Sequence, residues 1–144
     1  MTVTESQSHN DIQFIHDRLY EFNLSKTGGE RQEITVPATP ERTAFVIRDE
    51  NDQICGGTVF YLKDNGSTLY IDFLWMAEKL RGQNFGTKLI AKVKERAIAL
   101  QCRKIALQTR TYQAPDFYPK QGFTLAGTEP AGEFTAYHYE MILN

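Results

Sequence analysis

The chain has 144 residues, of which 41% are hydrophobic and 24% charged, and its formal net charge is −2 at pH 7. This length predicts a single domain over residues 1–144, with enough apolar residues to bury a core. The near-neutral charge gives no electrostatic support for nucleic acid or an anionic membrane as a partner, and no apolar run is long enough to indicate a membrane span.

The first ten residues lack the basic start and apolar centre of a signal peptide, so we expect a flexible tail over residues 1–10. The two cysteines, Cys55 and Cys102, have no spacing typical of metal ligands. We therefore expect reduced thiols in a cytoplasmic protein that holds no metal.

A helix is predicted over residues 11–24, with Asn10 or Asp11 as its N-cap. Its apolar stripe consists of Ile12, Ile15, Leu19 and Phe22. His16 lies off this stripe, and the general burial preference of histidine predicts that it faces solvent.

Three strands follow, at Thr43–Arg48, Gln53–Lys63 and Thr68–Met76. The Asn65-Gly66 pair between the second and third predicts a hairpin turn. The third strand is apolar on both faces except at Asp72, which is typical of a central strand covered on both sides.

A glycine-bearing loop over residues 81–86 then leads into an amphipathic helix over residues 85–100. The apolar stripe predicted for this helix consists of Phe85, Leu89, Ile90, Val93, Ala97 and Leu100. The first turn of a helix has unpaired backbone N–H groups and the positive end of the helix dipole, so this junction predicts an anion site. A P-loop is excluded because three residues separate Gly82 from Gly86 and Thr87 precedes Lys88. The alternative is a tight connection with no ligand, since short glycine loops are common between strands and helices.

The rest of the chain predicts a strand at Lys104–Arg110, a short helix at residues 116–121, and strands at Thr124–Thr128 and Phe134–Leu143. The order of elements is a helix, a hairpin meander, a βαβ unit and a final strand pair. This order predicts a mixed α+β fold.

The segment Arg81-Gly82-Gln83-Asn84-Phe85-Gly86 resembles the acyl-CoA pyrophosphate loop of the GNAT N-acetyltransferases, R/Q-x-x-G-x-G/A. Asn84 stands in place of the middle glycine, and asparagine is the other residue most at ease with positive φ. The segment Ala114–Phe123, APDFYPKQGF, resembles a second family motif, A-x-x-[LF]-Y-x-K-x-G-F. The resemblance covers roughly residues 43–144 and implies a mixed, mostly antiparallel sheet of six to seven strands with flanking helices.

The resemblance implies an N-acetyltransferase that moves an acetyl group from acetyl-CoA to a primary amine by direct attack in a ternary complex. Neither motif contains a cysteine, so no acyl-enzyme is expected. The residues that the resemblance assigns to the cosubstrate are Leu74, Trp75, Met76, Arg81, Gly82, Gln83, Asn84, Phe85, Gly86 and Thr87. Thr111 occupies a position where the family often has a pantetheine-binding asparagine.

Tyr118 matches the family tyrosine that acts as general acid, and its phenol is protonated at neutral pH. The alternative for Tyr118 is aromatic packing. Asp72 is the candidate base or amine anchor, or else a structurally paired carboxylate, because an unpaired one among apolar residues is costly. His138 is the histidine expected nearest the cleft, and it ranks below Asp72.

A cationic small-molecule amine is the preferred acceptor, with acidic character from Asp72, Glu78 and Glu133. Two alternatives stay open: a protein lysine or N-terminal acetyltransferase, and a catalytically weak acyl-CoA-binding or sensing module. A homodimer is expected only by analogy with the family.

Overall fold

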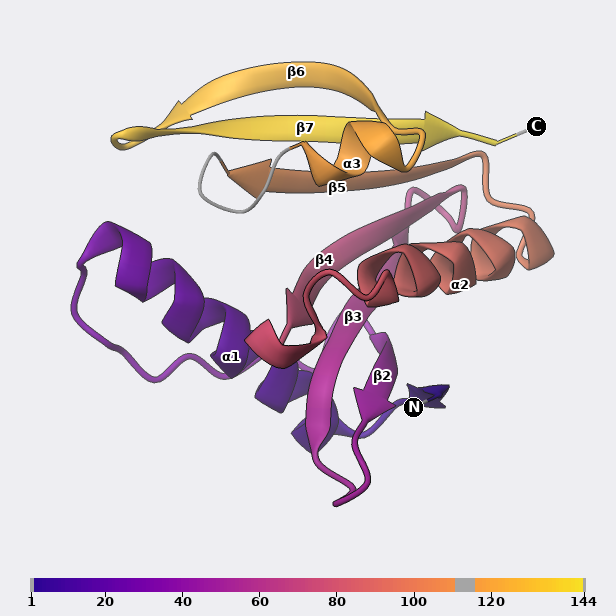
Figure 1. The fold of residues 1–144 in the computed structure, drawn as a ribbon. Coiled ribbons are helices and arrows are strands. Elements are labelled where there is room, and N and C mark those ends of the chain that lie inside the picture. Colours follow the sequence, from indigo (N-terminus) through magenta and orange to yellow (C-terminus); the bar gives the residue numbers. More distant parts are fainter. Residues whose placement is uncertain (1, 111–115, 144) are drawn as a thin grey trace.

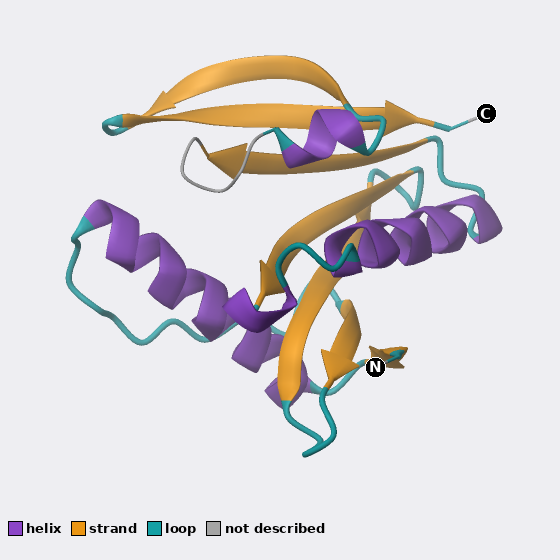
Figure 2. Ribbon diagram, in the orientation of Figure 1, coloured by secondary structure: helices purple, strands orange, loops and turns teal. Residues whose placement is uncertain are grey.

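The computed structural model describes residues 2–110 and 116–143. They form a seven-stranded sheet in the order β1-β2-β3-β4-β5-β7-β6, with helices on both faces (Figures 1 and 2). The elements are β1 (Val3–Ser6), α1 (His9–Thr27), β2 (Thr43–Arg48), β3 (Ile54–Lys63), β4 (Thr68–Met76), the 3₁₀ helix η1 (Glu78–Leu80), α2 (Phe85–Ala99), β5 (Lys104–Arg110), α3 (Phe117–Lys120), β6 (Thr124–Ala131) and β7 (Phe134–Ile142). Only the β4–β5 pair is parallel among these strands, so the predicted mixed, mostly antiparallel sheet is confirmed.

The N-terminal residues differ from the expected flexible tail. Val3–Ser6 pairs antiparallel with β2, from Val3 opposite Ile47 to Ser6 opposite Ala44. Glu5 of this strand also forms an ion pair with Arg96 on α2. The tail prediction is therefore wrong for β1, because the edge of β2 offers the backbone partners that a sequence pattern does not reveal.

Helix α1 begins earlier and ends later than predicted. Its N-cap is Ser8, whose hydroxyl accepts from the Asp11 backbone N–H at 3.4 Å. The Asp11 carboxylate instead accepts from Ser6 Oγ at 2.7 Å and pairs with Arg48 at 2.9 Å. The predicted cap at Asn10 or Asp11 is thus wrong, because the Asp11 carboxylate is held by groups outside the helix. Gly28 ends the helix in the left-handed conformation, with φ of 71°.

Two apolar clusters pack on opposite faces of the sheet. On one face, α2 places Leu89, Ile90 and Val93 against strand residues that include Leu69 and Ile105. On the other face, α1 packs on a smaller cluster made of Ile12, Ile15, Val36, Ala44, Val46 and Val59. Burial on both faces explains the continuous apolar sequence of β4.

The apolar stripe predicted for the second helix stops at Ala97, which is fully buried. Leu100 lies one residue past the end of α2 and is 46% exposed. The assignment of Leu100 to this stripe is therefore wrong, since the helical periodicity ends before it.

Strand β4 contains a bulge at Asp72. Phe73 pairs with Val59 and Ile71 pairs with Phe60, so Asp72 has no opposite residue on β3. Ile71 packs in the cluster under α2, whereas Phe73 packs in the cluster under α1. The extra residue therefore turns two successive side chains, Asp72 and Phe73, toward the α1 face, and a regular strand could not do this.

Strands β4 and β5 separate along their length. They pair only from Thr68 opposite Lys104 to Ile71 opposite Leu107. Beyond that point β4 continues to Met76 and β5 to Arg110 along diverging paths (Figure 1). The separation opens the middle of the sheet next to the start of α2.

The two cysteines, Cys55 and Cys102, are buried as thiols, and burial raises the pKa of both. Within residues 2–110 and 116–143, we find no helix with the length and apolar character needed to span a bilayer.

Candidate active site

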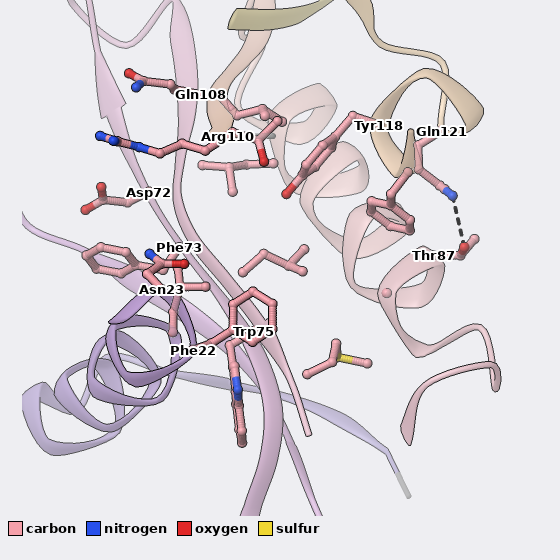
Figure 3. Close-up of a pocket in the computed structure, with 18 of the residues that line it drawn as sticks. Phe22, Asn23, Asp72, Phe73, Trp75, Thr87, Gln108, Arg110, Tyr118 and Gln121 are labelled. Atoms are coloured by element: carbon pink, nitrogen blue, oxygen red, sulfur yellow. Dashed lines mark hydrogen bonds between the residues drawn. The ribbon is translucent and has the colours of Figure 1, made fainter. Parts of the chain in front are cut away.

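A cleft of about 830 Å³ lies where β4 and β5 separate. Its walls come from α1 on one side and from α3 and the start of α2 on the other (Figure 3). The lining is continuous from Gly86 at the helix start, past Leu74, to Asp72 and Arg110. The cleft thus has one end at the glycine-bearing loop and another between α1 and β5.

The loop end presents backbone groups. Asn84 has φ of 63° and ψ of 19°, the left-handed conformation that asparagine tolerates, and Gly82 has φ of 81°. The Lys88 N–H donates to the Asn84 carbonyl at 3.1 Å and closes the first turn of α2. The preceding N–H groups of Phe85, Gly86 and Thr87 therefore point out of the helix end, where they can bind an anion.

Gly86 has a close neighbour, the Phe117 ring. A Cβ atom at this position would lie 3.1 Å from Cζ and 3.2 Å from Cε1 of the Phe117 ring. A side chain at position 86 would therefore require the Phe117 ring of α3 to shift by a few tenths of an ångström. The neighbouring Thr87 Oγ1 accepts from Gln121 Nε2 at 3.1 Å, which ties the two helices together beside the cleft (Figure 3).

The open edge of β4 also presents backbone groups to the cleft. The Ala77 N–H donates to the Cys55 carbonyl at 2.8 Å on the β3 side. By the alternation of an antiparallel pair, Trp75 also directs its backbone to β3, whereas Leu74 and Met76 direct theirs to the gap left by β5. An extended ligand arm can pair with these groups as a strand would.

Tyr118 lies on the opposite wall of the cleft. Its ring packs against those of Phe117, Phe123 and Tyr139, with centroids 5.2, 5.7 and 6.0 Å away. Its hydroxyl points into the cleft (Figure 3). Burial raises the pKa of Tyr118 well above the ordinary range, so the phenol keeps its proton at neutral pH. Packing and proton donation are therefore compatible at this residue.

Asp72 is both paired and part of the cleft wall. Its Oδ2 accepts from Arg42 Nε at 2.8 Å, and the two side chains are only 20% and 10% exposed. Arg42 also donates to the carbonyls of Pro37 and Pro40 at 2.9 and 3.0 Å, which fixes its position. Asp72 is thus both a paired carboxylate and a cleft-lining one, so the two interpretations from the sequence do not exclude each other.

The α1 wall contains residues that sequence reasoning missed. The His16 side chain is only 13% exposed and lines the cleft, so the expectation of a solvent-facing histidine is wrong. Its ring lies edge-on to Phe73 at 5.2 Å because the bulge turns Phe73 toward α1. His138, the histidine expected near the cleft, is not among the lining residues and bonds to Glu129 at 2.8 Å.

A sequence signal for the α1 wall existed in the helical spacing. His16, Tyr20 and Asn23 are separated by four and three residues, which places them on one face of α1, and all three line the cleft. The opposite wall at this end comes from Gln108 and Arg110 on β5. Their alternation with buried Leu107 and Thr109 was visible in the sequence, but the separation of β5 from β4 was not.

Most of the residues assigned from the sequence meet at this cleft. Those that line it are Asp72, Leu74, Trp75, Met76, Arg81, Gly82, Asn84, Gly86, Thr87 and Tyr118. Phe85 instead packs in the core and is 7% exposed, and the Gln83 side chain donates to the Lys79 carbonyl at 2.8 Å. The Arg81 guanidinium lies 5.7 Å from the centre of the Phe22 ring on α1. Thr111 and the start of the second motif, Ala114 and Pro115, lie outside the described residues.

Comparison with known proteins agrees with this geometry. The family model described as the acetyltransferase (GNAT) family matches residues 11–123. The chain belongs to the GNAT acetyltransferase family.

Among relatives of this GNAT chain, blasticidin-S acetyltransferase from Streptomyces morookaense is 33% identical over 82 residues, which are 56% of this chain and 59% of that protein. The chain therefore spans less than two thirds of this relative's length. Acetyltransferase Atu2258 from Agrobacterium fabrum is 27% identical over 115 residues, covering 79% of this chain and 76% of the relative. A solved aminoglycoside 6′-N-acetyltransferase, complexed with coenzyme A, superposes with a TM-score of 0.77 at 16% identity and covers 99% of this chain and 97% of its own. That likeness shows the fold.

Proposed function

We propose that this protein is an N-acetyltransferase that moves the acetyl group of acetyl-CoA to a primary amine of a small molecule. The observation that carries the proposal is the separation of β4 from β5 between the start of α2 and the Tyr118 hydroxyl. The family supports it, as do relatives that are named acetyltransferases and a solved neighbour that holds coenzyme A.

The cleft fits acetyl-CoA in the chemistry of its groups. The N–H groups at the start of α2 suit the pyrophosphate, and the absence of a side chain at Gly86 keeps the approach open. The outward backbone groups of Leu74 and Met76 suit the amide-containing arm of the cosubstrate. Phe85 and Gln83 contribute through the backbone of this turn, since their side chains are engaged elsewhere.

The reaction needs a neutral amine and a protonated leaving group. The amine nitrogen attacks the thioester carbonyl, a C–N bond forms, and the C–S bond breaks to release a thiolate. In our proposal Tyr118 gives its phenolic proton to that sulfur and regains one from solvent. Asp72 anchors the acceptor amine or takes its proton, either directly or through water.

Steady-state kinetics test the proposal. Thiol release from acetyl-CoA is measured with small amines, a lysine peptide and a peptide with a free N-terminus, and both substrates are varied. We expect release with a small amine and intersecting double-reciprocal lines, which indicate a ternary complex. Parallel lines would contradict direct attack, and faster release with a peptide would favour a protein acetyltransferase.

A catalytically weak binding module makes a different prediction. Such a protein binds acetyl-CoA but releases thiol no faster with any amine than without one. This result would overturn the transferase proposal and leave the binding site intact.

A further inference from the structure

The charges at the acceptor end of the cleft do not suit a cationic acceptor. Asp72 is the one carboxylate among the residues that the structure describes as lining the cleft. Its charge is compensated by Arg42, at 2.8 Å, and this pair is largely buried. Residues 111–115 read Thr-Tyr-Gln-Ala-Pro and therefore add no acidic group. Glu78, which the sequence suggested as an acidic contributor, is exposed and outside the lining.

Arg110 gives this end a positive charge. It is two residues after Gln108 on β5, so both side chains emerge on the same face of the sheet. Figure 3 shows both side chains reaching toward the side of the cleft where Asp72 lies. A guanidinium has five N–H donors, so Arg110 can contact the protein and a ligand at the same time.

Together, the paired Asp72 and the Arg110 guanidinium favour an acceptor with an anionic group over a polycationic acceptor. The Asp72–Arg42 pair has no net formal charge, and Arg110 adds a guanidinium to the described lining of this end. A polyamine brought here would meet a like charge, whereas a carboxylate or phosphonate would meet a planar donor that matches two of its oxygens. The amide of Gln108 can bind a further oxygen.

We infer that the physiological acceptor is an amine that also carries an oxyanion, and that Arg110 with Gln108 binds the oxyanion while the amine lies toward Tyr118. This inference rests on the proposed acetyltransferase function and replaces the cationic acceptor expected from the sequence. Of the two roles proposed for Asp72, it keeps removal of the amine proton and replaces amine anchoring by oxyanion binding at Arg110 and Gln108. It makes Arg110 a specificity-determining residue of the same site.

Matched acceptors test the inference in the wild-type protein. Thiol release is compared for α-amino acids, their decarboxylated amines, the corresponding aminophosphonates and spermidine. We expect kcat/KM to be at least about tenfold higher for the anion-bearing member of each pair, as for a charge-assisted hydrogen bond. The ratio between carboxylates and phosphonates then identifies which oxyanion fits.

Variants assign the preference to Arg110. Arg110→Gln should lower kcat/KM for the anion-bearing acceptor by about tenfold to a hundredfold, while KM for acetyl-CoA stays the same. Arg110→Glu should reverse the preference toward the decarboxylated amine, and a folding defect cannot produce a reversal. The matched control is Arg103→Gln, which changes an exposed arginine outside the cleft lining and should leave all rates unchanged.

The outcomes separate the two proposals. Higher kcat/KM for spermidine or for the decarboxylated amines overturns the oxyanion inference and leaves the transferase intact. An anion preference that survives in Arg110→Gln and Arg110→Glu also overturns it, because another group must then bind the anion. Thiol release that no amine of any class accelerates overturns both.

Discussion

The two ends of the cleft are built from different parts of the chain. The end that we propose for the donor, the donor end, consists of backbone groups from two neighbouring segments, the open edge of β4 and the turn into α2. The acceptor end consists of side chains from α1, β4 and β5, held by a bulge and by the Asp72–Arg42 pair. Backbone groups are the same whatever the side chain, so we expect the donor end to tolerate substitution except where a side chain blocks it.

This difference between the two ends of the cleft explains how one fold can bind different acceptors. In the function that we propose, donor binding depends on the local conformation of residues 82–87, whereas acceptor binding depends on which side chains project from elements far apart in sequence. On this proposal, a change at Arg110 or His16 alters the acceptor without disturbing the turn proposed for the donor.

The largest expected effect comes from Gly86→Glu at the donor end. The new Cβ would lie within 3.2 Å of the Phe117 ring, and the carboxylate would face the proposed pyrophosphate site. We expect KM for acetyl-CoA to rise by at least about a thousandfold through like-charge repulsion and steric block. Gly127→Glu is the control, since a Cβ there meets nothing within 4 Å. An unchanged KM would contradict the donor site.

Tyr118→Phe should lower kcat by about a hundredfold to a thousandfold, the range for loss of a positioned proton donor. KM for acetyl-CoA should change little because the ring packing is kept. Tyr137→Phe is the control, since Tyr137 stacks on Tyr139 at the edge of the same aromatic group and is not among the residues lining the cleft. Equal rates in the two variants would leave Tyr118 with a packing role alone.

The dependence of kcat on pH tests the proposed role of Tyr118 as a proton donor. Burial raises the pKa of its phenol, and the protonated form is the one that donates. A raised pKa extends that form to higher pH, so kcat should not fall from loss of this proton below about pH 10, the ordinary value for tyrosine. A fall in kcat near neutral pH that disappears in Tyr118→Phe would contradict this assignment.

Asp72→Asn should destabilise the fold at the acceptor end by about 2–3 kcal/mol, because it leaves the largely buried Arg42 without its anionic partner. Chemical denaturation measures this loss in the free energy of unfolding. The matched control is Asp52→Asn, since Asp52 is 88% exposed and lies 3.9 Å from Arg48. That change should cost less than about 0.5 kcal/mol. Similar losses in the two variants would show that burial of the Asp72 pair contributes nothing.

The smallest effect is expected at the end of α1. Gly28→Ala should cost about 1 kcal/mol, because Gly28 has φ of 71° and its N–H donates to the Leu24 carbonyl at 2.8 Å. Gly29→Ala should cost less, since Gly29 does not have this backbone conformation and a Cβ there would meet ordinary contacts. Thermal unfolding compares the two. Equal shifts in Tm would rule out the conformational explanation.

The sequence predicted the donor end better than the acceptor end for a physical reason. The strand, the turn and α2 follow one another from Thr68 to Ala99, so local patterns and a short motif were sufficient to place Asn84 and Gly86. The acceptor end depends on the bulge at Asp72 and on the separation of β5, which are properties of strand pairing. His16 was misassigned because helix periodicity shows which residues share a face but not which neighbour covers it.

Two further features depend on contacts between distant segments and could not be predicted from local patterns: the N-terminal strand and the charge at the acceptor end of the cleft. Val3–Ser6 has no strong strand pattern, and its strand conformation is defined by its pairing with β2. Arg42 lies far from Asp72 in sequence, so the neutralisation of that carboxylate could not be read from either segment alone. When the Arg42 partner was not known, the Asp72 carboxylate indicated a cationic acceptor.

Calorimetric titration of the wild-type protein with acetyl-CoA tests the central claim most directly, that the gap between β4 and β5 is a donor site. We expect saturable binding with a micromolar dissociation constant and no requirement for an amine. Absence of binding at millimolar acetyl-CoA would show that this gap is not a donor site, because the exposed N–H groups of α2 and the open edge of β4 would then bind no cosubstrate.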